Sequence, residues 1–262
     1  MKERKILFEV CANSVESCLA AQEGGADRVE LCAGIPEGGI TPSYGEIWQA
    51  RKLLSSTLLH VIIRPRGGDF LYSPLEMERM ERDIGMCRQL GVDGVVFGCL
   101  TADGEIDIES NVRLLTLTKG MSVTFHRAFD HCQCPKKALE QLIELGFDRV
   151  LTSGQQANAH AGVHLLRELQ RQADGRIAIM AGCGVNESNI LDIFQATEIA
   201  EYHFSARIPI KSGMRKTNHQ VFMGNQEMDE DTILRTSSRR VEDTIHALTN
   251  HCADRQEGLS TT

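Results

Sequence analysis

Short apolar runs alternate with longer amphipathic segments along almost the whole chain. The apolar runs are rich in β-branched residues, which is typical of buried strands, and the longer segments have the periodicity of helices packed on one face. The predicted strands are residues 6–11, 28–32, 61–63, 95–97, 122–126, 149–152, 177–181 and 199–205. The predicted helices are residues 14–24, 43–55, 74–90, 108–118, 135–145, 162–173, 186–195 and 239–251.

Eight strand-then-helix units joined by short connections indicate either a closed barrel or a large doubly wound sheet. The spacing of roughly 25–30 residues per unit favours a single-domain TIM-type (β/α)8 barrel. No GxGxxG pattern follows the first strand, which weakens the doubly wound alternative. The predicted barrel domain covers residues 1–251, with a long irregular segment at 206–240 after the eighth strand and a disordered tail at 252–262.

The predicted strands carry polar residues at alternate positions, opposite apolar ones. Since alternate side chains of a strand share a face and the outer face of a barrel packs on helices, the polar sets are expected to line the barrel. Burying so many ionisable groups is costly without a purpose. The gathering of these polar side chains on the inward faces therefore predicts a functional site at the carboxyl ends of the strands. Its residues are Glu9, Cys11, Glu30, Cys32, Arg64, Arg66, His126, His203 and Ser205.

The third strand leads into an arginine-proline-arginine sequence followed by two glycines. If Arg64 and Arg66 share a face at the strand end, their guanidiniums form a fork that can receive an anion; otherwise they pair with structural carboxylates. Ser153 at a neighbouring strand end and the Gly182 and Gly184 amides after the seventh strand could add phosphate contacts, although these glycines also suit a tight turn. His203 and Ser205 complete this predicted anion-binding set.

Proton transfer in such a site would need acids and bases. Glu9 and Glu30 are the candidate carboxylates, and His126 with Asp130 could form an acid/base or orienting pair. A single inward glutamate could equally balance an arginine, and a single histidine is more often a hydrogen-bonded core residue.

The sequence EVC, which ends at Cys11, returns as ELC, which ends at Cys32. If adjacent parallel strands align these copies, the two thiols lie side by side at the barrel rim and suit a soft ion such as Cu(I). The alternative is that two small side chains simply fill the barrel mouth. The chain has nine cysteines, an odd number set mostly in apolar patterns, which argues against a secreted disulfide framework.

Composition excludes several classes of function. A net charge of −8 over 262 residues argues against nucleic-acid binding, which needs clustered positive charge. No apolar stretch resembles a signal peptide or a membrane span, so a soluble, cytoplasmic protein without a membrane partner is predicted.

Several segments together resemble the CutC copper-homeostasis family. They are EVC and GGADRVELC near the start, EGGITPS, IRPRGGDFLYS, VTFHRAFD, RVLTSG, GCGV and HFSAR. The resemblance covers residues 8–214. It implies a TIM-type barrel, a cytoplasmic location, self-association as a dimer or tetramer, and copper handling, with Cu(I) bound by thiols at the positions of Cys11 and Cys32.

Two functions follow as hypotheses. In the first, Cys11 and Cys32 hold Cu(I), and the barrel buffers or passes the ion. In the second, the protein is an enzyme that acts on a small anionic or phosphorylated metabolite at the carboxyl face of the barrel. Two thiols do not explain the two arginines and two histidines, which keeps the enzyme hypothesis open.

Overall fold

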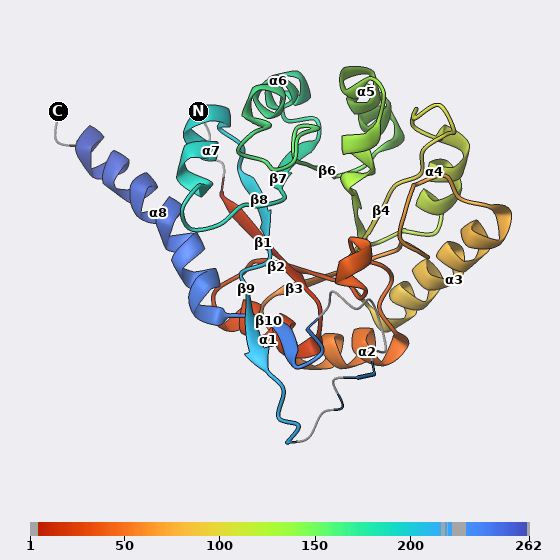
Figure 1. The fold of residues 1–262 in the computed structure, drawn as a ribbon. Coiled ribbons are helices and arrows are strands. Elements are labelled where there is room, and N and C mark those ends of the chain that lie inside the picture. Colours follow the sequence, from red (N-terminus) through yellow and green to blue (C-terminus); the bar gives the residue numbers. More distant parts are fainter. Residues whose placement is uncertain (1–4, 216–217, 219, 222–228, 261–262) are drawn as a thin grey trace.

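The structure is a computed structural model that describes residues 5–215, 218, 220–221 and 229–260. Eight parallel strands close into a barrel in chain order, and β1 pairs with both β2 and β8. Helices surround this barrel, as Figure 1 shows. The strands are β1 (Leu7–Ala12), β2 (Arg28–Leu31), β3 (Leu58–Ile62), β4 (Gly94–Phe97), β5 (Ser122–Phe125), β6 (Arg149–Thr152), β7 (Ala178–Gly182) and β8 (Glu201–Phe204). The predicted TIM-type barrel is confirmed.

The helices follow the predicted positions closely because their ends carry the expected signals. Ser14, Ser43 and Ser73 each cap a helix start with their side chain, and Gly91 and Gly146 end helices in the left-handed conformation. The helices are α1 (Val15–Glu23), α2 (Tyr44–Leu53), α3 (Pro74–Leu90), α4 (Ile108–Leu115), α5 (Pro135–Leu145), α6 (Val163–Ala173), α7 (Ile190–Thr197) and α8 (Ser238–Ser260), with 3-10 turns η1 (Ile35–Glu37) and η2 (Arg127–His131).

The apolar face of each strand packs outward against the helices, as the alternation predicts. On neighbouring strands β1 and β8, Phe8 stacks on Tyr202 with ring centroids 6.4 Å apart and meets Phe204 edge-on at 6.5 Å. All three rings are buried. The opposite faces of the same strands carry Glu9, Glu201 and His203, so the polar set lies inside the barrel.

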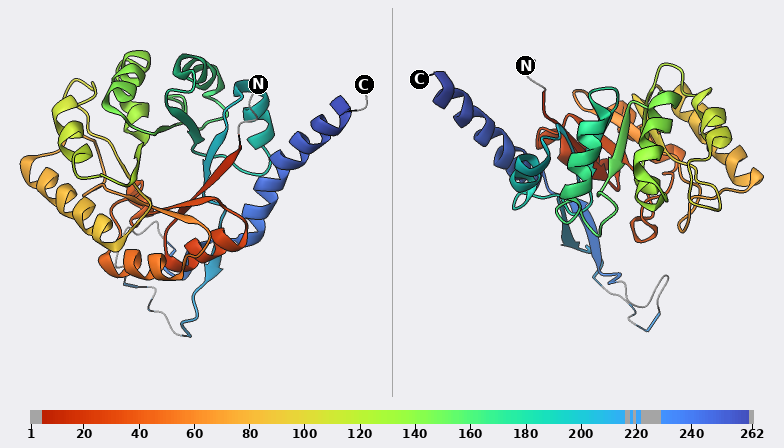
Figure 2. Two further views of the ribbon diagram at one scale, coloured as in Figure 1. Left: turned by 180° about the vertical axis from the view of Figure 1, so that it is seen from behind. Right: turned by 90° about the horizontal axis from the view of Figure 1, so that it is seen from above.

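The segment after β8 is more regular than the sequence pattern suggested. Strands β9 (Arg207–Lys211) and β10 (Thr232–Thr236) pair antiparallel and extend from the barrel, as Figures 1 and 2 show. Both strands contain β-branched residues, Ile208 and Ile210 in β9 and Thr232, Ile233 and Thr236 in β10, which favour extended pairing. The Asn13 side chain donates to the Leu234 carbonyl, which ties this hairpin to the end of β1.

The last helix also differs from the expectation. α8 packs against α1 and α7 and then projects beyond the barrel (Figure 2). Its backbone stays helical through 252–260, where the sequence predicted a disordered tail. That stretch has no proline and only one glycine, so nothing in it stops the helix. Residues 261–262 lie outside the described part of the chain.

Candidate metal centre in the barrel interior

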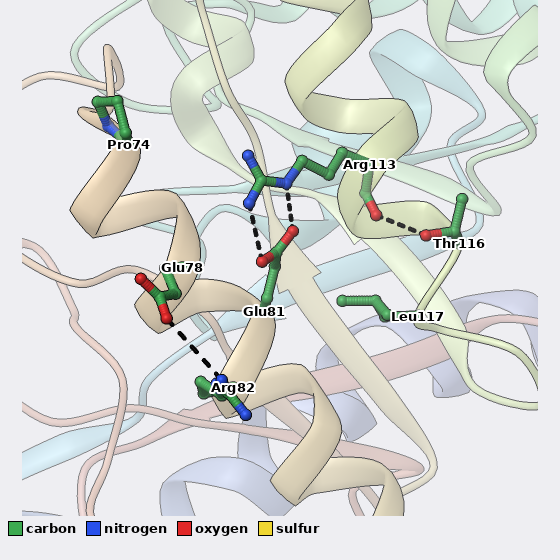
Figure 3. A pocket seen from close by; sticks show the side chains of 7 residues that line it. All are labelled: Pro74, Glu78, Glu81, Arg82, Arg113, Thr116 and Leu117. Atoms are coloured by element: carbon green, nitrogen blue, oxygen red, sulfur yellow. Dashed lines mark hydrogen bonds and ion pairs between the residues drawn. The ribbon is translucent and has the colours of Figure 1, made fainter.

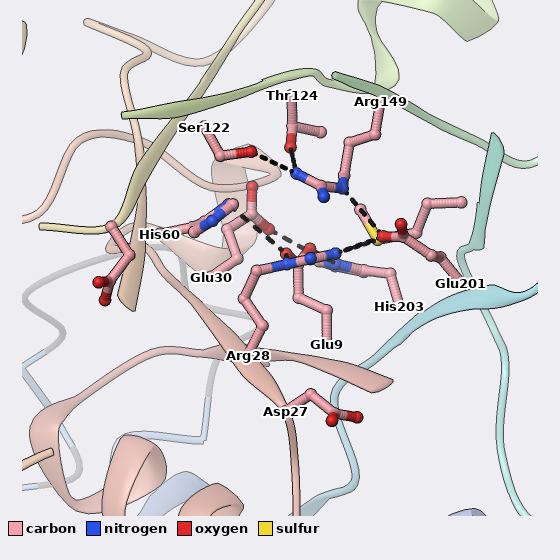
Figure 4. A network of polar contacts seen from close by, with 12 residues as sticks. Glu9, Asp27, Arg28, Glu30, His60, Ser122, Thr124, Arg149, Glu201 and His203 are labelled. Atoms are coloured by element: carbon pink, nitrogen blue, oxygen red, sulfur yellow. Dashed lines mark hydrogen bonds and ion pairs between the residues drawn. The ribbon is translucent and has the colours of Figure 1, made fainter. Parts of the chain in front are cut away.

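The strand register brings a set of charged side chains together inside the barrel. Glu9 on β1 is the register partner of Arg28 on β2 and of His203 on β8. Glu30 on β2 is likewise the partner of Cys11 on β1 and of His60 on β3. Figure 4 shows the side chains of Glu9, Arg28, Glu30, His60 and His203 pointing toward one another from strands that are far apart in the sequence.

Arg28 lies at the centre of this network and is 3 % exposed. Its Nε donates to Glu9, and its Nη2 donates to Glu201 Oε2 at 2.8 Å. Arg149 Nε binds the same Glu201 oxygen at 2.9 Å. Burial alone would raise the pKa of Glu9, but Arg28, with His203 and His60, holds this pKa well below its usual value. Glu9 is therefore a buried carboxylate that is fully compensated by its neighbours.

Toward the carboxyl ends of β1 and β2, the network meets a cluster of possible metal ligands. Cys11 Sγ lies 3.6 Å from Cys32 Sγ. One ligand atom each from Cys11, Glu30 and His203 lies within 4.8 Å of the other two. The predicted closeness of the two cysteines is confirmed, and Glu30 and His203 add a carboxylate and an imidazole.

His203 is oriented by a carboxylate on each side. Its Nδ1 lies 2.7 Å from Glu9 Oε1, and its Nε2 lies 3.5 Å from Glu30 Oε2. A histidine whose Nδ1 donates to a carboxylate presents a basic Nε2, which is the usual arrangement around bound metal ions. The sequence assigned His203 to anion binding, but the ionised Glu9 beside its ring disfavours an anion there.

The two thiols are electrostatically different. The Cys32 thiol, His203 and Arg207 together hold the pKa of Cys11 well below its usual value, against the effect of burial. Arg207 Nη2 lies 3.8 Å from Cys11 Sγ. The neighbouring Cys11 sulfur and burial raise the pKa of Cys32 far above its usual value. The pair is thus one thiolate and one thiol, and the thiol donates to the Ala12 carbonyl at 3.4 Å.

Glu30 remains protonated near neutral pH because burial raises its pKa to about 8, against the opposing effect of His203. Its Oε1 is buried and has no hydrogen-bond partner among the described residues. Glu9 and Glu30, the predicted proton-transfer residues, therefore differ in charge. Glu9 is ionised and paired, whereas Glu30 is a neutral acid at the edge of the thiol pair.

We expect Glu30 to make stability fall as pH rises. The pKa of Glu30 in the folded protein exceeds its ordinary value of 4.5, so the folded state holds the proton more tightly. The stability that this contributes is lost as pH rises between about 4.5 and 8. Glu30→Gln should reduce this slope and stabilise the protein above pH 8 by on the order of 3 kcal/mol. Urea unfolding at several pH values measures the effect. The exposed Glu23→Gln is the control, and parallel curves for Glu30→Gln and wild type would contradict the expectation.

The two arginines of the predicted anion fork do not face one position. β3 ends at Ile62, Pro65 lies between the two arginines and a turn at Gly68 follows them, so the strand periodicity does not extend to Arg66. Arg64 Nη atoms donate to the carbonyls of Glu37, Gly39 and Gly68 at 2.7–2.9 Å. Arg66 binds Glu76 at 2.6 Å and Asp69 at 2.9 Å.

The side chains of His126 and Asp130, predicted to form a pair, have different hydrogen-bond partners in the structure. His126 Nδ1 accepts from the Ala128 backbone at 3.2 Å and caps η2. The Asp130 carboxylate instead binds Arg127, Thr152 and the Ser153 backbone at 2.5–3.1 Å. Asp130 thereby fixes the loop after β6, and His126 lies apart from it.

The predicted phosphate contacts do not assemble either. Gly182 ends β7, and a side chain there would collide with Leu151, so this glycine is required for close packing. The Gly184 carbonyl accepts from Asn189 at 2.8 Å, and α7 begins only at Ile190. Ser153 Oγ donates to the Gln156 carbonyl at 2.6 Å. Ser205 follows β8 and is half-buried, with its carbonyl accepting from Thr236.

Four residues of the network were not assigned a role from the sequence: Arg28, His60, Arg149 and Glu201. His60 lies two positions before Ile62 and therefore on the same, inward face of the strand, and Arg149 begins the sixth strand. The alternation of faces along a strand could have identified both residues. Burial lowers the pKa of His60 to about 3, although Glu9 opposes this effect, and the ring is neutral.

A surface hollow lies away from this interior site. Figure 3 shows it between α3 and α4, lined in part by Glu81, Arg82 and Arg113. Arg113 pairs with Glu81, and Arg82 with Glu78 at 3.8 Å. Its charges are thus internally paired, and we assign it no chemistry.

Comparison with known proteins agrees with the fold and shows the family to which the chain is related. The profile of the CutC family matches residues 6–208. A CutC family protein of Bacteroides thetaiotaomicron is 64 % identical over 246 residues, which cover 94 % of this chain and 99 % of that protein. A relative of the same description from Chromobacterium violaceum is 50 % identical and covers 90 % of this chain and 95 % of its own.

Among solved structures, a CutC protein of Streptococcus agalactiae, described as a candidate copper homeostasis protein, superposes with a TM-score of 0.74 and 37 % identity. The match covers 76 % of this chain and 98 % of that one. Thiamine phosphate pyrophosphorylase of Pyrococcus furiosus, at 14 % identity and a TM-score of 0.57, covers 94 % of this chain and 96 % of its own, and shares the fold.

Proposed function

Because this chain belongs to the CutC family, we propose that it handles copper by binding Cu(I) through Cys11, Cys32 and His203. The observation that carries the proposal is the pair of sulfur atoms 3.6 Å apart with an imidazole and a carboxyl group beside them. Thiolate sulfur is the ligand type that Cu(I) prefers, and imidazole nitrogen also suits copper. Glu9 would orient His203 from behind.

The donor set fits a soft monovalent ion better than a hard divalent one. Two thiolates neutralise Cu(I) with one negative charge in excess, which Arg207 near Cys11 offsets. A hard cation would need several carboxylates or carbonyls. Of the two carboxyl groups nearby, Glu9 is engaged by Arg28, and Glu30 is held neutral by burial.

We further propose that the protein works in the cytoplasm. All the cysteines of the described side chains are free, including the adjacent pair, which is the state expected in a reducing compartment. Among the described residues, no helix has the length and apolarity that crossing a membrane requires. Self-association as a dimer or tetramer stays a prediction.

Copper binding should strengthen as pH rises. Cys32 must lose its proton to become a ligand. The His203 imidazolium must lose a proton as well, because the Cys11 thiolate and the flanking carboxyl groups raise its pKa despite burial. We therefore expect about two protons to be released for each Cu(I) bound near neutral pH. Competition with a chromophoric Cu(I) chelator at several pH values measures the slope. An affinity independent of pH would contradict thiol and imidazole ligation.

Fewer observations support the alternative that the protein is an enzyme acting on a phosphorylated metabolite. The Nη atoms of Arg64, the whole Arg66 fork and the Ser153 hydroxyl bind groups of the chain itself. Catalysis by this protein stays a prediction.

A further inference from the structure

Arg64 is a buried cation without an anionic partner. Its side chain is 4 % exposed, and no ion pair joins it to a carboxylate in the part of the chain that the structure describes. Its Nη atoms bind backbone carbonyls, and its Nε has no hydrogen-bond partner among the residues that the structure describes. A buried guanidinium that lacks a counter-charge is costly, so an anion beside Nε would stabilise it.

His126 offers a second donor without an acceptor. The residue is 4 % exposed, and burial together with Arg64 lowers its pKa to about 3, so the ring is neutral at physiological pH. Because Nδ1 accepts a hydrogen bond from Ala128, the single ring proton must be on Nε2. Nε2 is buried and meets no partner among the described residues.

Phe70 holds these two donors in the same neighbourhood. The Arg64 guanidinium lies 5.0 Å from the Phe70 ring centroid, and the His126 ring centroid lies 5.0 Å from it as well. The Tyr72 hydroxyl belongs to the residue two positions after Phe70. It is a third buried polar group that has no hydrogen-bond partner among the described residues. All three follow β3 or β5 at the carboxyl end of the barrel, where ligands of this fold bind.

We propose that Arg64 Nε, His126 Nε2 and the Tyr72 hydroxyl bind a small monocarboxylate beside the thiol pair. One cationic donor and two neutral donors match a single negative charge shared by two oxygens, whereas a phosphate dianion would leave charge uncompensated. Gly39 separates this subsite from the thiols. Its carbonyl accepts from Arg64 at 2.9 Å, and a Cβ on it would lie 3.6 Å from Cys32 Cβ.

This carboxylate subsite uses no metal ligand, so it stands apart from the proposed function. The test is a titration of the metal-free full chain with [13C]acetate and [13C]formate, followed by NMR, with inorganic phosphate as a parallel probe. Wild type should bind acetate or formate saturably and more tightly than phosphate. Cys11→Ser/Cys32→Ser should bind them equally well, even if it loses copper.

Removing one donor should weaken carboxylate binding about five-fold, as expected for one hydrogen bond. We expect this weakening in both His126→Phe and Tyr72→Phe. Tyr72→Phe keeps an aromatic ring beside Arg66, so it preserves the fold even if His126→Phe does not. The exposed Tyr44→Phe is the matched control and should bind as wild type does. Absence of saturable binding to wild type, or equal binding by Tyr72→Phe, would overturn the proposal.

Discussion

Replacing Cys11 and Cys32 together with serine should weaken Cu(I) binding by more than about 1,000-fold, or about 4 kcal/mol. A serine hydroxyl is a hard, protonated oxygen that cannot replace a thiolate for this ion. The sulfur atoms lie 3.6 Å apart, so one ion can contact both. Competition with a chromophoric chelator gives the affinity and the stoichiometry.

The control for this variant removes a thiol elsewhere. Cys134→Ser changes an exposed cysteine before α5 and should leave both affinity and stoichiometry unchanged. If the double variant still binds one Cu(I) with the affinity of wild type, the thiol pair is not the copper site.

Arg28→Met should cost about 3–5 kcal/mol of unfolding free energy. The substitution leaves Glu9 and Glu201 buried without the guanidinium that both of them bind. Because the lowered pKa of Glu9 depends largely on Arg28, the stability it contributes above its usual pKa should also shrink. Urea unfolding at neutral pH measures the loss.

A matched substitution tests whether burial is the cause. Arg176 binds both carboxylate oxygens of Glu140 at 2.7–2.9 Å, but both side chains are more than 40 % exposed. Arg176→Met should therefore cost much less unfolding free energy than Arg28→Met, because solvent screens the exposed pair. Equal losses for the two variants would show that the interior network does not hold the barrel together as the geometry implies.

The sequence predicted the barrel because its units share the same physical signals: an apolar strand rich in β-branched residues, a serine or proline at several helix starts, and a glycine at several helix ends. It also placed Glu9, Cys11, Glu30, Cys32 and His203 inside, because alternation in a strand decides the face. The EVC and ELC sequences indicated adjacent thiols, and the two sulfur atoms do lie 3.6 Å apart. The copies are not aligned as the prediction assumed, because the register pairs Cys11 with Glu30 and offsets them by two residues.

The partners of these residues could not be predicted. His203 contacts Glu9 only through the register of β1 with β8, which are separated by almost the whole chain. Arg64 and Arg66 were placed by an alternation that ends at Ile62, and the turn beyond it sends them to different groups. His126 was paired with Asp130 by nearness in sequence, whereas the backbone enters η2 between them and turns Asp130 toward β6.

The coordination of bound copper tests the central claim most directly. X-ray absorption of the protein loaded with one equivalent of Cu(I) should show two sulfur neighbours and one imidazole nitrogen. The nitrogen should disappear in His203→Gln, and the sulfur neighbours in Cys11→Ser/Cys32→Ser. A spectrum with only nitrogen or oxygen neighbours in wild type, or one unchanged by these substitutions, would contradict the assignment of Cys11, Cys32 and His203 as the copper ligands.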